Sequence, residues 1–187
     1  MKLSLFTASL LLTGSLYASG THHVSATKEG IDAIKLLGKT LKTNLKAKLQ
    51  EDSNGTAAIT FCTSEAQNIT AQVNEKLPSN VKVRRTSLNL RNLANKPDAT
   101  DIRIMKKYQE AIKKHSEAAT LMTTVEEGKA TRVYKPLIMG GVCLKCHGEN
   151  IAANIASAIQ AAYSEDNATG LKAGDFRGVI VAEVKKD

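Results

Sequence analysis

The chain has 187 residues, which is the length of one ordinary domain with at most a small appendage. Its 42% hydrophobic and 24% charged residues are enough to bury a core, so a disordered tail and a collagen-like repeat are both excluded. The formal net charge of +8 favours anionic partners, but 4% aromatic residues and no Trp are too few for single-stranded nucleic-acid binding. We therefore expect a globular domain that does not bind nucleic acid.

Residues 1–20 have the pattern of a secretory signal peptide. Lys2 precedes an apolar stretch that ends in the small residues Ala18, Ser19 and Gly20. A membrane anchor is the alternative, but this stretch is shorter than the roughly 20 apolar residues of a spanning helix, and no later segment is long enough either. We predict cleavage near Gly20, a periplasmic location for a single domain of residues 21–187, and no stable membrane insertion.

Three helices are predicted in the first two thirds of the chain. An amphipathic helix is expected from Ser25 to about Gln50, where Ile and Leu recur every three or four residues opposite a Lys-rich face. A second apolar stripe runs from Ala58 to Leu77, is ended by Pro78, and carries Cys62 on its buried face. The third helix is expected over about 98–115.

Strands are predicted between and after these helices. A short strand is expected at Val81 and Val83, and residues 120–124 and 130–134 should form a hairpin around Gly128. A helix over 150–163, a polar loop over 164–178 and a last strand over 179–184 complete the chain. Helices early and strands late predict an α+β domain.

The segment from Cys143 to His147 reads Cys-Leu-Lys-Cys-His, which is the pattern of c-type haem attachment. Two residues between the thiols let both sulfurs reach the two vinyl-derived carbons on one edge of a porphyrin, and the adjacent imidazole can bind the iron. The sequence therefore predicts one covalent haem c, with Cys143 and Cys146 as attachment residues and His147 as an iron ligand.

Other uses of this Cys-x-x-Cys-His segment are less consistent with the sequence. A redox-active pair is expected near a strand-to-helix junction of a βαβ unit, and no such pattern is present. A structural zinc site needs four N or S ligands, which only Cys62 or distant His residues could complete. A disulfide between Cys143 and Cys146 would not explain why His147 directly follows them.

The sequence pattern alone does not decide which residue is the second axial ligand of the iron. Cys62 is a thiol without a third partner for a disulfide, although a buried free Cys is often only a small hydrophobe. Met at these positions is usually core filler, and His115 suits the end of a helix. An open sixth position is the last alternative. The remaining candidates are Met105, Met122, Met139, His22 and His23.

Several segments resemble a bacterial family of exported haem c domains that was long catalogued as a domain of unknown function. The family has a PAS-like fold and occurs alone or as the sensing part of membrane-bound signalling proteins. The resemblance covers about Cys62 to Gly178. The matching segments are Arg85-Thr86-Ser87, Arg91 to Asp98, Lys135-Pro136-Leu137, Cys143 to Gly148, and Tyr163 to Gly178 with Gly-Asp-Phe-Arg-Gly at its end.

The resemblance implies a PAS-like antiparallel sheet with long N-terminal helices, and iron bound between His147 and Cys62. The sequence departs from the family at Leu93, Ser164, Leu171 and Thr100-Asp101, so loops near the haem are expected to differ. A thiolate ligand stabilises ferric over ferrous iron, which predicts a low reduction potential.

Three functions follow from these expectations: a redox or ligand sensor, a small electron carrier with an acidic redox partner, and a peroxidase-type enzyme with an open or labile sixth position. Non-enzymatic use is favoured, because His115 is the only evident acid-base group and its spacing gives no support. Arg177 is predicted to have a structural role or to bind a haem propionate. Pairing with a propionate or with the thiolate is also open to Arg84, Arg85, Arg91 and Lys135, but each of these is expected to be a solvated surface charge.

Overall fold

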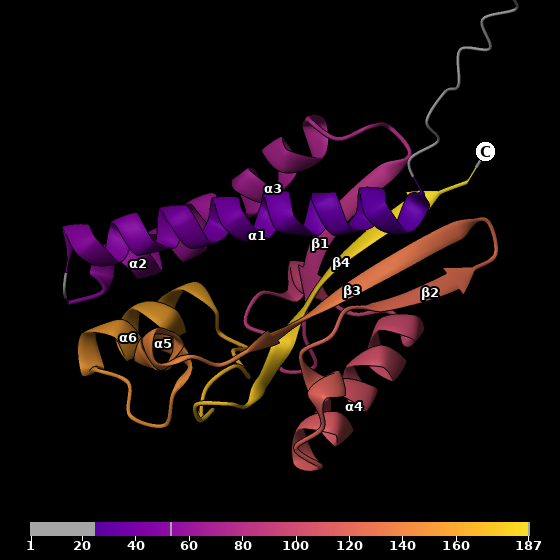
Figure 1. Ribbon diagram of the computed structural model, residues 1–187. Coiled ribbons are helices and arrows are strands. Elements are labelled where there is room, and N and C mark those ends of the chain that lie inside the picture. Colours follow the sequence, from indigo (N-terminus) through magenta and orange to yellow (C-terminus); the bar gives the residue numbers. More distant parts are fainter. Residues whose placement is uncertain (1–24, 53, 187) are drawn as a thin grey trace, which may run out of the picture.

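The structure is a computed structural model that describes residues 25–52 and 54–186, so the predicted signal peptide and its cleavage site near Gly20 lie outside the described residues. It is an α+β domain, as predicted (Figure 1). The helices are α1 (Ala26–Glu51), α2 (Thr56–Thr60), α3 (Ala66–Glu75), α4 (Ala99–Lys113), α5 (Leu144–His147) and α6 (Ala153–Ala162). The strands are β1 (Val81–Thr86), β2 (Thr123–Glu127), β3 (Ala130–Ile138) and β4 (Phe176–Lys185).

The four strands form one antiparallel sheet in the order β1-β4-β3-β2. The hairpin β2–β3 is tighter than predicted: its first strand lies at Thr123–Glu127 rather than 120–124, because Gly128 adopts φ 56° in a two-residue turn. Strand β4 also begins earlier than predicted, at Phe176. Gly178 with φ 153° allows this, since a Cβ there would lie 2.5 Å from the Thr86 carbonyl oxygen.

Helix α1 covers one face of the sheet and buries the apolar stripe that the sequence predicted. Ser25 caps it by accepting a hydrogen bond from the Lys28 amide. Its Ala33, Ile34 and Leu37 pack with side chains of β1, β3 and β4, together with Val73 from α3. Alternate strand residues point to this face, as the two-residue period of a strand requires.

Helix α4 covers the opposite face, where Ile104, Met105 and Tyr108 pack against Tyr134 and Val181. The predicted third helix over about 98–115 is therefore confirmed, with ends at Ala99 and Lys113. Asp98 and Asp101 form a capping box at its N-terminus, in which each carboxylate accepts a hydrogen bond from the other residue's amide.

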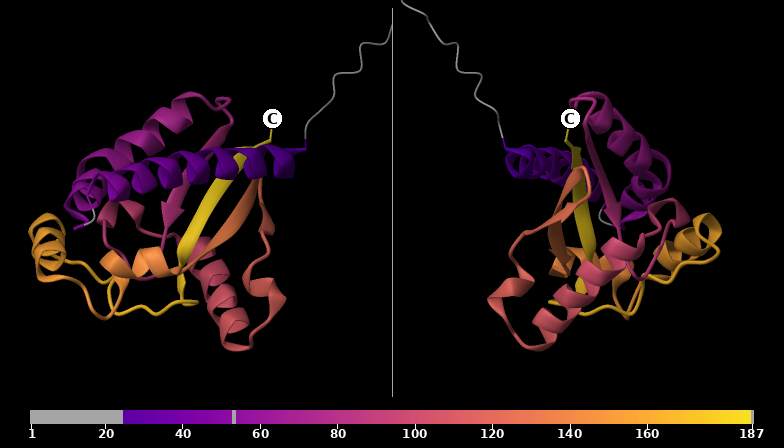
Figure 2. Two further views of the ribbon diagram at one scale, coloured as in Figure 1. Left: turned by 60° about the vertical axis from the view of Figure 1, so that its left-hand side comes forward. Right: turned by 90° about the vertical axis from the view of Figure 1, so that its right-hand side faces the viewer.

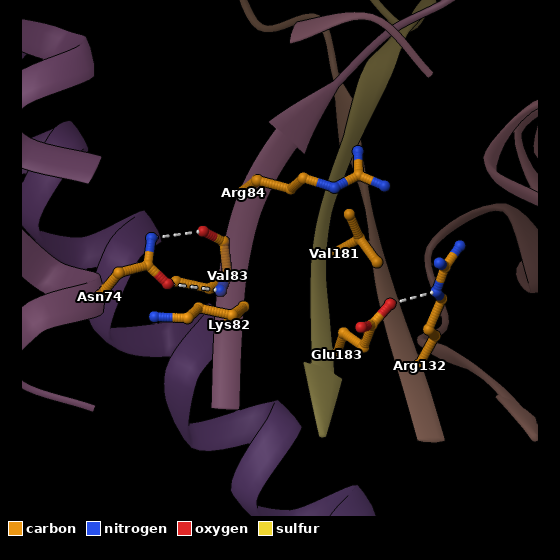
Figure 3. A pocket seen from close by; sticks show the side chains of 7 residues that line it. All are labelled: Asn74, Lys82, Val83, Arg84, Arg132, Val181 and Glu183. Carbon is orange, nitrogen blue, oxygen red and sulfur yellow. Dashed lines mark hydrogen bonds and ion pairs between the residues drawn. The ribbon is translucent and has the colours of Figure 1, made fainter. Parts of the chain in front are cut away.

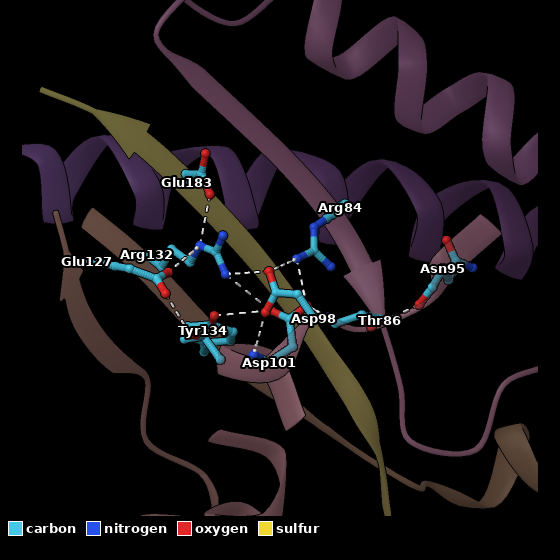
Figure 4. Close-up of polar contacts among 10 residues, drawn as sticks. Arg84, Thr86, Asn95, Asp98, Asp101, Glu127, Arg132, Tyr134 and Glu183 are labelled. Carbon is cyan, nitrogen blue, oxygen red and sulfur yellow. Dashed lines mark hydrogen bonds and ion pairs between the residues drawn. The ribbon is translucent and has the colours of Figure 1, made fainter. Parts of the chain in front are cut away.

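A polar network joins this helix N-terminus to the sheet (Figure 4). The Asp101 carboxylate is fully buried and accepts hydrogen bonds from Arg84 at 2.6 Å and from the Tyr134 hydroxyl at 3.1 Å. Burial raises the pKa of Tyr134, so its hydroxyl stays protonated as a donor. Arg132 binds Asp98 at 2.6 Å and Glu183 at 2.8 Å beside it. The network fixes α4 on the sheet.

Beyond one end of the sheet, α6 lies below α2, and the short helix α5 lies between α6 and the sheet (Figures 1 and 2). Ile59 of α2 packs with Ile155 and Ile159 of α6, and the partly buried Cys146 and Tyr163 lie against this cluster. This third apolar cluster is separate from the two cores of the sheet. It places Cys146 of the attachment segment next to α2, which ends two residues before Cys62.

A shallow pocket of about 270 Å³ opens on the sheet (Figure 3). Asn74 of α3 lines it and bonds both main-chain groups of Val83 at 2.8 Å, accepting from the amide and donating to the carbonyl. Lys82, Arg84, Arg132, Val181 and Glu183 also line it, and none of its lining residues belongs to the attachment segment or to the turn with Cys62. None of the described helices combines the length and apolar character needed to cross a membrane.

Candidate functional site

The attachment segment forms a single helical turn that the following loop holds in place. Helix α5 contains Cys146 and His147, and Cys143 directly precedes it. The Leu171 amide donates to the His147 carbonyl at 2.9 Å, and the Gly170 amide donates to the Gly148 carbonyl at 3.0 Å. Gly148 is required after the turn, because a Cβ there would lie 2.6 Å from the Leu144 carbonyl oxygen. All three cysteines of the chain are free.

The imidazole of His147 is oriented by a hydrogen bond that leaves its Nε2 free to bind a metal. Its Nδ1 lies 2.7 Å from the Ala168 carbonyl oxygen, which can only accept, so Nδ1 carries the proton and Nε2 keeps its lone pair. Burial, with the nearby charges of Arg177 and Arg91, lowers the pKa of His147 to about 3. The imidazole is therefore neutral near pH 7, which is the form that binds a metal.

Arg91 braces the attachment turn, contrary to the expectation that it would be solvated. Its side chain is 8% exposed, and its guanidinium binds the Asp166 carboxylate through Nε at 3.2 Å and Nη2 at 2.9 Å. The same Nη2 donates to the Cys146 carbonyl at 2.6 Å. Asp166 also accepts from the Ala168 amide at 2.9 Å, so one buried ion pair orders both Cys146 and the residue that orients His147.

Cys62 lies in a turn of π-helix, η1 (Phe61–Glu65), that interrupts the predicted second helix between α2 and α3. The extra residue of the turn changes the register: Phe61 is buried in the protein, whereas Cys62 is half-buried rather than on the core-facing stripe. The Tyr163 hydroxyl donates to the Cys62 carbonyl at 3.1 Å. This bond joins the Cys62 turn to the end of α6.

The electrostatics show that Cys62 and the attachment turn are neighbours. Burial raises the pKa of the Cys62 thiol, and a charge on Cys146 would raise it further, while Arg85 and Arg91 lower it. Burial likewise raises the pKa of Cys146. The structure thus brings Cys62 near Cys146, although more than 80 positions separate them in the sequence, and His147 directly follows Cys146.

Arg177, the predicted propionate or structural residue, also lies near these groups. One of its terminal nitrogens donates to Ser87 Oγ at 2.8 Å and to the Asn89 carbonyl at 3.1 Å. Burial and the charge of Arg91 lower the pKa of Arg177 to about 10. Within residues 25–52 and 54–186, its guanidinium forms no ion pair with a carboxylate.

The other ligands considered from the sequence are placed elsewhere. Met105 is part of the α4 core, and Met122 packs against the α1 core. His115 is exposed, with φ 51°, where α4 ends. Met139 is 3% exposed, between the ends of β3 and the loop before β4. His22 and His23 lie outside the described residues.

The donor set constrains what the site could hold. In the part of the chain that the structure describes, no three His, Cys, Asp or Glu side chains form a group suited to a bare metal ion. A porphyrin differs, because it supplies four iron ligands itself and needs only an axial nitrogen and sulfur from the protein. Two free thiols beside a neutral imidazole, with a third thiol nearby, match that requirement.

Comparisons with known proteins give the fold and the family of the chain. A solved structure described as that of the cyanobacterial haem protein Tll0287 superposes with a TM-score of 0.63 and 21% sequence identity, covering 84% of this chain and 92% of that one. No curated protein sequence matches. A family model described as Tll0287-like matches residues 20–184, nearly the whole chain, and the protein therefore belongs to the Tll0287-like family.

Proposed function

We propose that the protein is an exported, periplasmic c-type haem protein with one haem. Cys143 and Cys146 would hold the porphyrin through thioether bonds, and His147 and Cys62 would be the axial ligands. The observation that carries the proposal is the placement of Cys62 beside Cys146 and the neutral, oriented His147. The family relationship supports haem binding. The bound group would supply a single-electron couple.

Different residues of the chain would have different roles in holding the haem. Cys143 and Cys146 would each add across one vinyl group, with the sulfur on one carbon and the thiol hydrogen on the other, so no oxidant would be required. Ala168 fixes the His147 tautomer. The Arg91–Asp166 pair holds the turn that carries Cys146. Arg177 has two neutral acceptors and no carboxylate partner in the described chain, which supports its pairing with a propionate.

Redox sensing is the role that the Cys62 turn favours. An anionic sulfur stabilises ferric iron, so Cys62 is held less strongly after reduction. Turns of π-helix are frequent at functional sites, and this one is continuous with α3, which packs on β1. A change at Cys62 can therefore reach the sheet through one helix.

Electron transfer to an acidic partner is the second role, and it is favoured by the surface of α1. Lys35, Lys39, Lys42 and Lys46 are exposed along one side of this helix. None of the four pairs with a carboxylate of the described residues. An unpaired basic stripe steers association with an acidic protein and weakens as salt is added.

The attachment is tested by intact-mass measurement of protein matured in a host that makes c-type haem proteins. The native chain is expected to carry the mass of one haem, which survives acidified-solvent extraction. A Cys143→Ser, Cys146→Ser double variant should lose it, because both thioether bonds are then impossible. Cys62→Ser is the matched control and should keep covalent haem. A native chain with only the polypeptide mass would refute the proposal.

Carbon monoxide added to the reduced holoprotein separates the two roles. We expect Cys62 to yield its position to carbon monoxide and the visible spectrum to change, because the sulfur is held less strongly in the ferrous state. The spectrum of the oxidised protein should not change under the same gas, which is the control. An unchanged spectrum of the reduced protein would instead favour electron transfer.

A further inference from the structure

Arg85 is the cation near Cys62 that has no counter-ion. Arg91 is neutralised by Asp166, but Arg85 forms no ion pair with any carboxylate in residues 25–52 and 54–186. Its only hydrogen bond is a long one, 3.5 Å from Nη2 to the Ala66 carbonyl. Its Nε is buried and has no hydrogen-bond partner.

A buried guanidinium in this state is unfavourable unless an anion joins it. An arginine has five N–H donors in a fixed plane, and a buried donor that stays unpaired costs free energy comparable to that of a lost hydrogen bond. Strand β1 nevertheless carries Arg85 toward the π-turn rather than into water. The Ala66 carbonyl that it contacts directly follows this turn.

Cys62 is the candidate for that anion, because it lies in the π-turn whose end Arg85 contacts. Burial lowers the pKa of Arg85, and a negative charge on Cys62 or Tyr163 would raise it again, so both groups lie near its guanidinium. Tyr163 stays a neutral donor, because burial raises its pKa and its hydroxyl bonds the Cys62 carbonyl. Arg177 is placed differently, since its strongest charged neighbours are Arg91 and Asp166.

We propose that Arg85 is a positioning residue for Cys62: its guanidinium pairs with the Cys62 sulfur in the thiolate form and makes the site easier to reduce. This inference rests on the proposed function, because it requires Cys62 to be an iron ligand. Reduction takes one electron from an external donor, which is oxidised, and adds one negative charge to the site. A fixed positive charge nearby stabilises that reduced state.

The test is a potentiometric titration of the holoprotein with three variants. Arg85→Gln removes the charge, Arg85→Lys keeps it, and Arg103→Gln removes an exposed charge from α4 as the control. We expect Arg85→Gln to lower the equilibrium constant for reduction about tenfold, which is about 59 mV for one electron. Arg85→Lys should retain most of the native value, and Arg103→Gln should match it.

Two outcomes would overturn the role of Arg85. The first is a reduction potential of Arg85→Gln that equals that of Arg103→Gln. The second is a reduction potential of Arg85→Gln above that of the native protein. If Arg85→Gln does not fold, Arg85→Met replaces it, because its apolar side chain of similar length fills the same space without a buried polar group. If the native protein carries covalent haem with a low-spin spectrum, the proposed function holds whatever the potentials of the Arg85 variants. Failure of the Arg85 role is therefore distinguishable from failure of the proposed function.

Discussion

Replacing Cys62 with alanine is expected to abolish the low-spin spectrum of the oxidised protein and to raise its reduction potential. The methyl group cannot bind iron, so the anionic sulfur that stabilises the ferric state is lost. The shift should be on the order of hundreds of millivolts, within the roughly 0.8 V that axial ligands span. Optical spectra in both oxidation states and a potentiometric titration measure the two effects.

Thr63→Ala is the matched control for the Cys62 variant. Thr63 is the next residue of the same π-turn, and its hydroxyl only donates to the Thr60 carbonyl at 3.0 Å. Its removal should leave the spectrum and the potential unchanged. If Cys62→Ala also has the native spectrum and potential, Cys62 is not a ligand, and another side chain or an open position becomes the explanation.

The Asp101→Ala variant is expected to lose about 3 kcal/mol of unfolding free energy, at the lower end of the range for breaking a buried ion pair. The carboxylate is fully buried. Its loss leaves Tyr134 and the Asp98 amide without their acceptor, and it leaves Arg84 with Asp98 as its carboxylate neighbour, at 3.6 Å. The value is not larger, because the Arg84 side chain is 41% exposed and water can solvate it. Urea denaturation followed by circular dichroism measures the change.

Glu110→Ala is the control for Asp101→Ala, because Glu110 is an exposed carboxylate of the same helix. Its stability should differ little from that of the native protein. Tyr134→Phe should cost about 1 kcal/mol, since it removes one hydrogen bond to Asp101. A loss below about 1 kcal/mol for Asp101→Ala would show that the network contributes little net stability.

Features encoded within short stretches of sequence were predictable. The three- and four-residue spacing of Ile and Leu identified α1, because one face of that helix is buried along the sheet. Gly128 identified the hairpin, although counting four turn residues displaced its first strand. The attachment segment was equally local, since both thiols and the imidazole lie within five residues.

Features that depend on distant partners were not predictable. A single apolar stripe predicted one continuous helix from Ala58, and nothing in its spacing indicated the extra residue of the π-turn at Cys62. Arg91 was predicted to be a solvated surface charge, because its partner Asp166 lies 75 positions away in the sequence. The buried, unpaired state of Arg85 was hidden for the same reason, since it depends on where β1 meets the π-turn.

Strand β1 is an outer strand of the sheet, where free amide and carbonyl groups can recruit a strand from another molecule. Asn74 already occupies both groups of Val83 with its carboxamide. The carboxamide thus makes the two hydrogen bonds that a neighbouring strand would make with Val83, so a strand of another molecule cannot pair there. At Val83, therefore, one residue of α3 occupies the main-chain groups through which a strand of another molecule would pair with this edge.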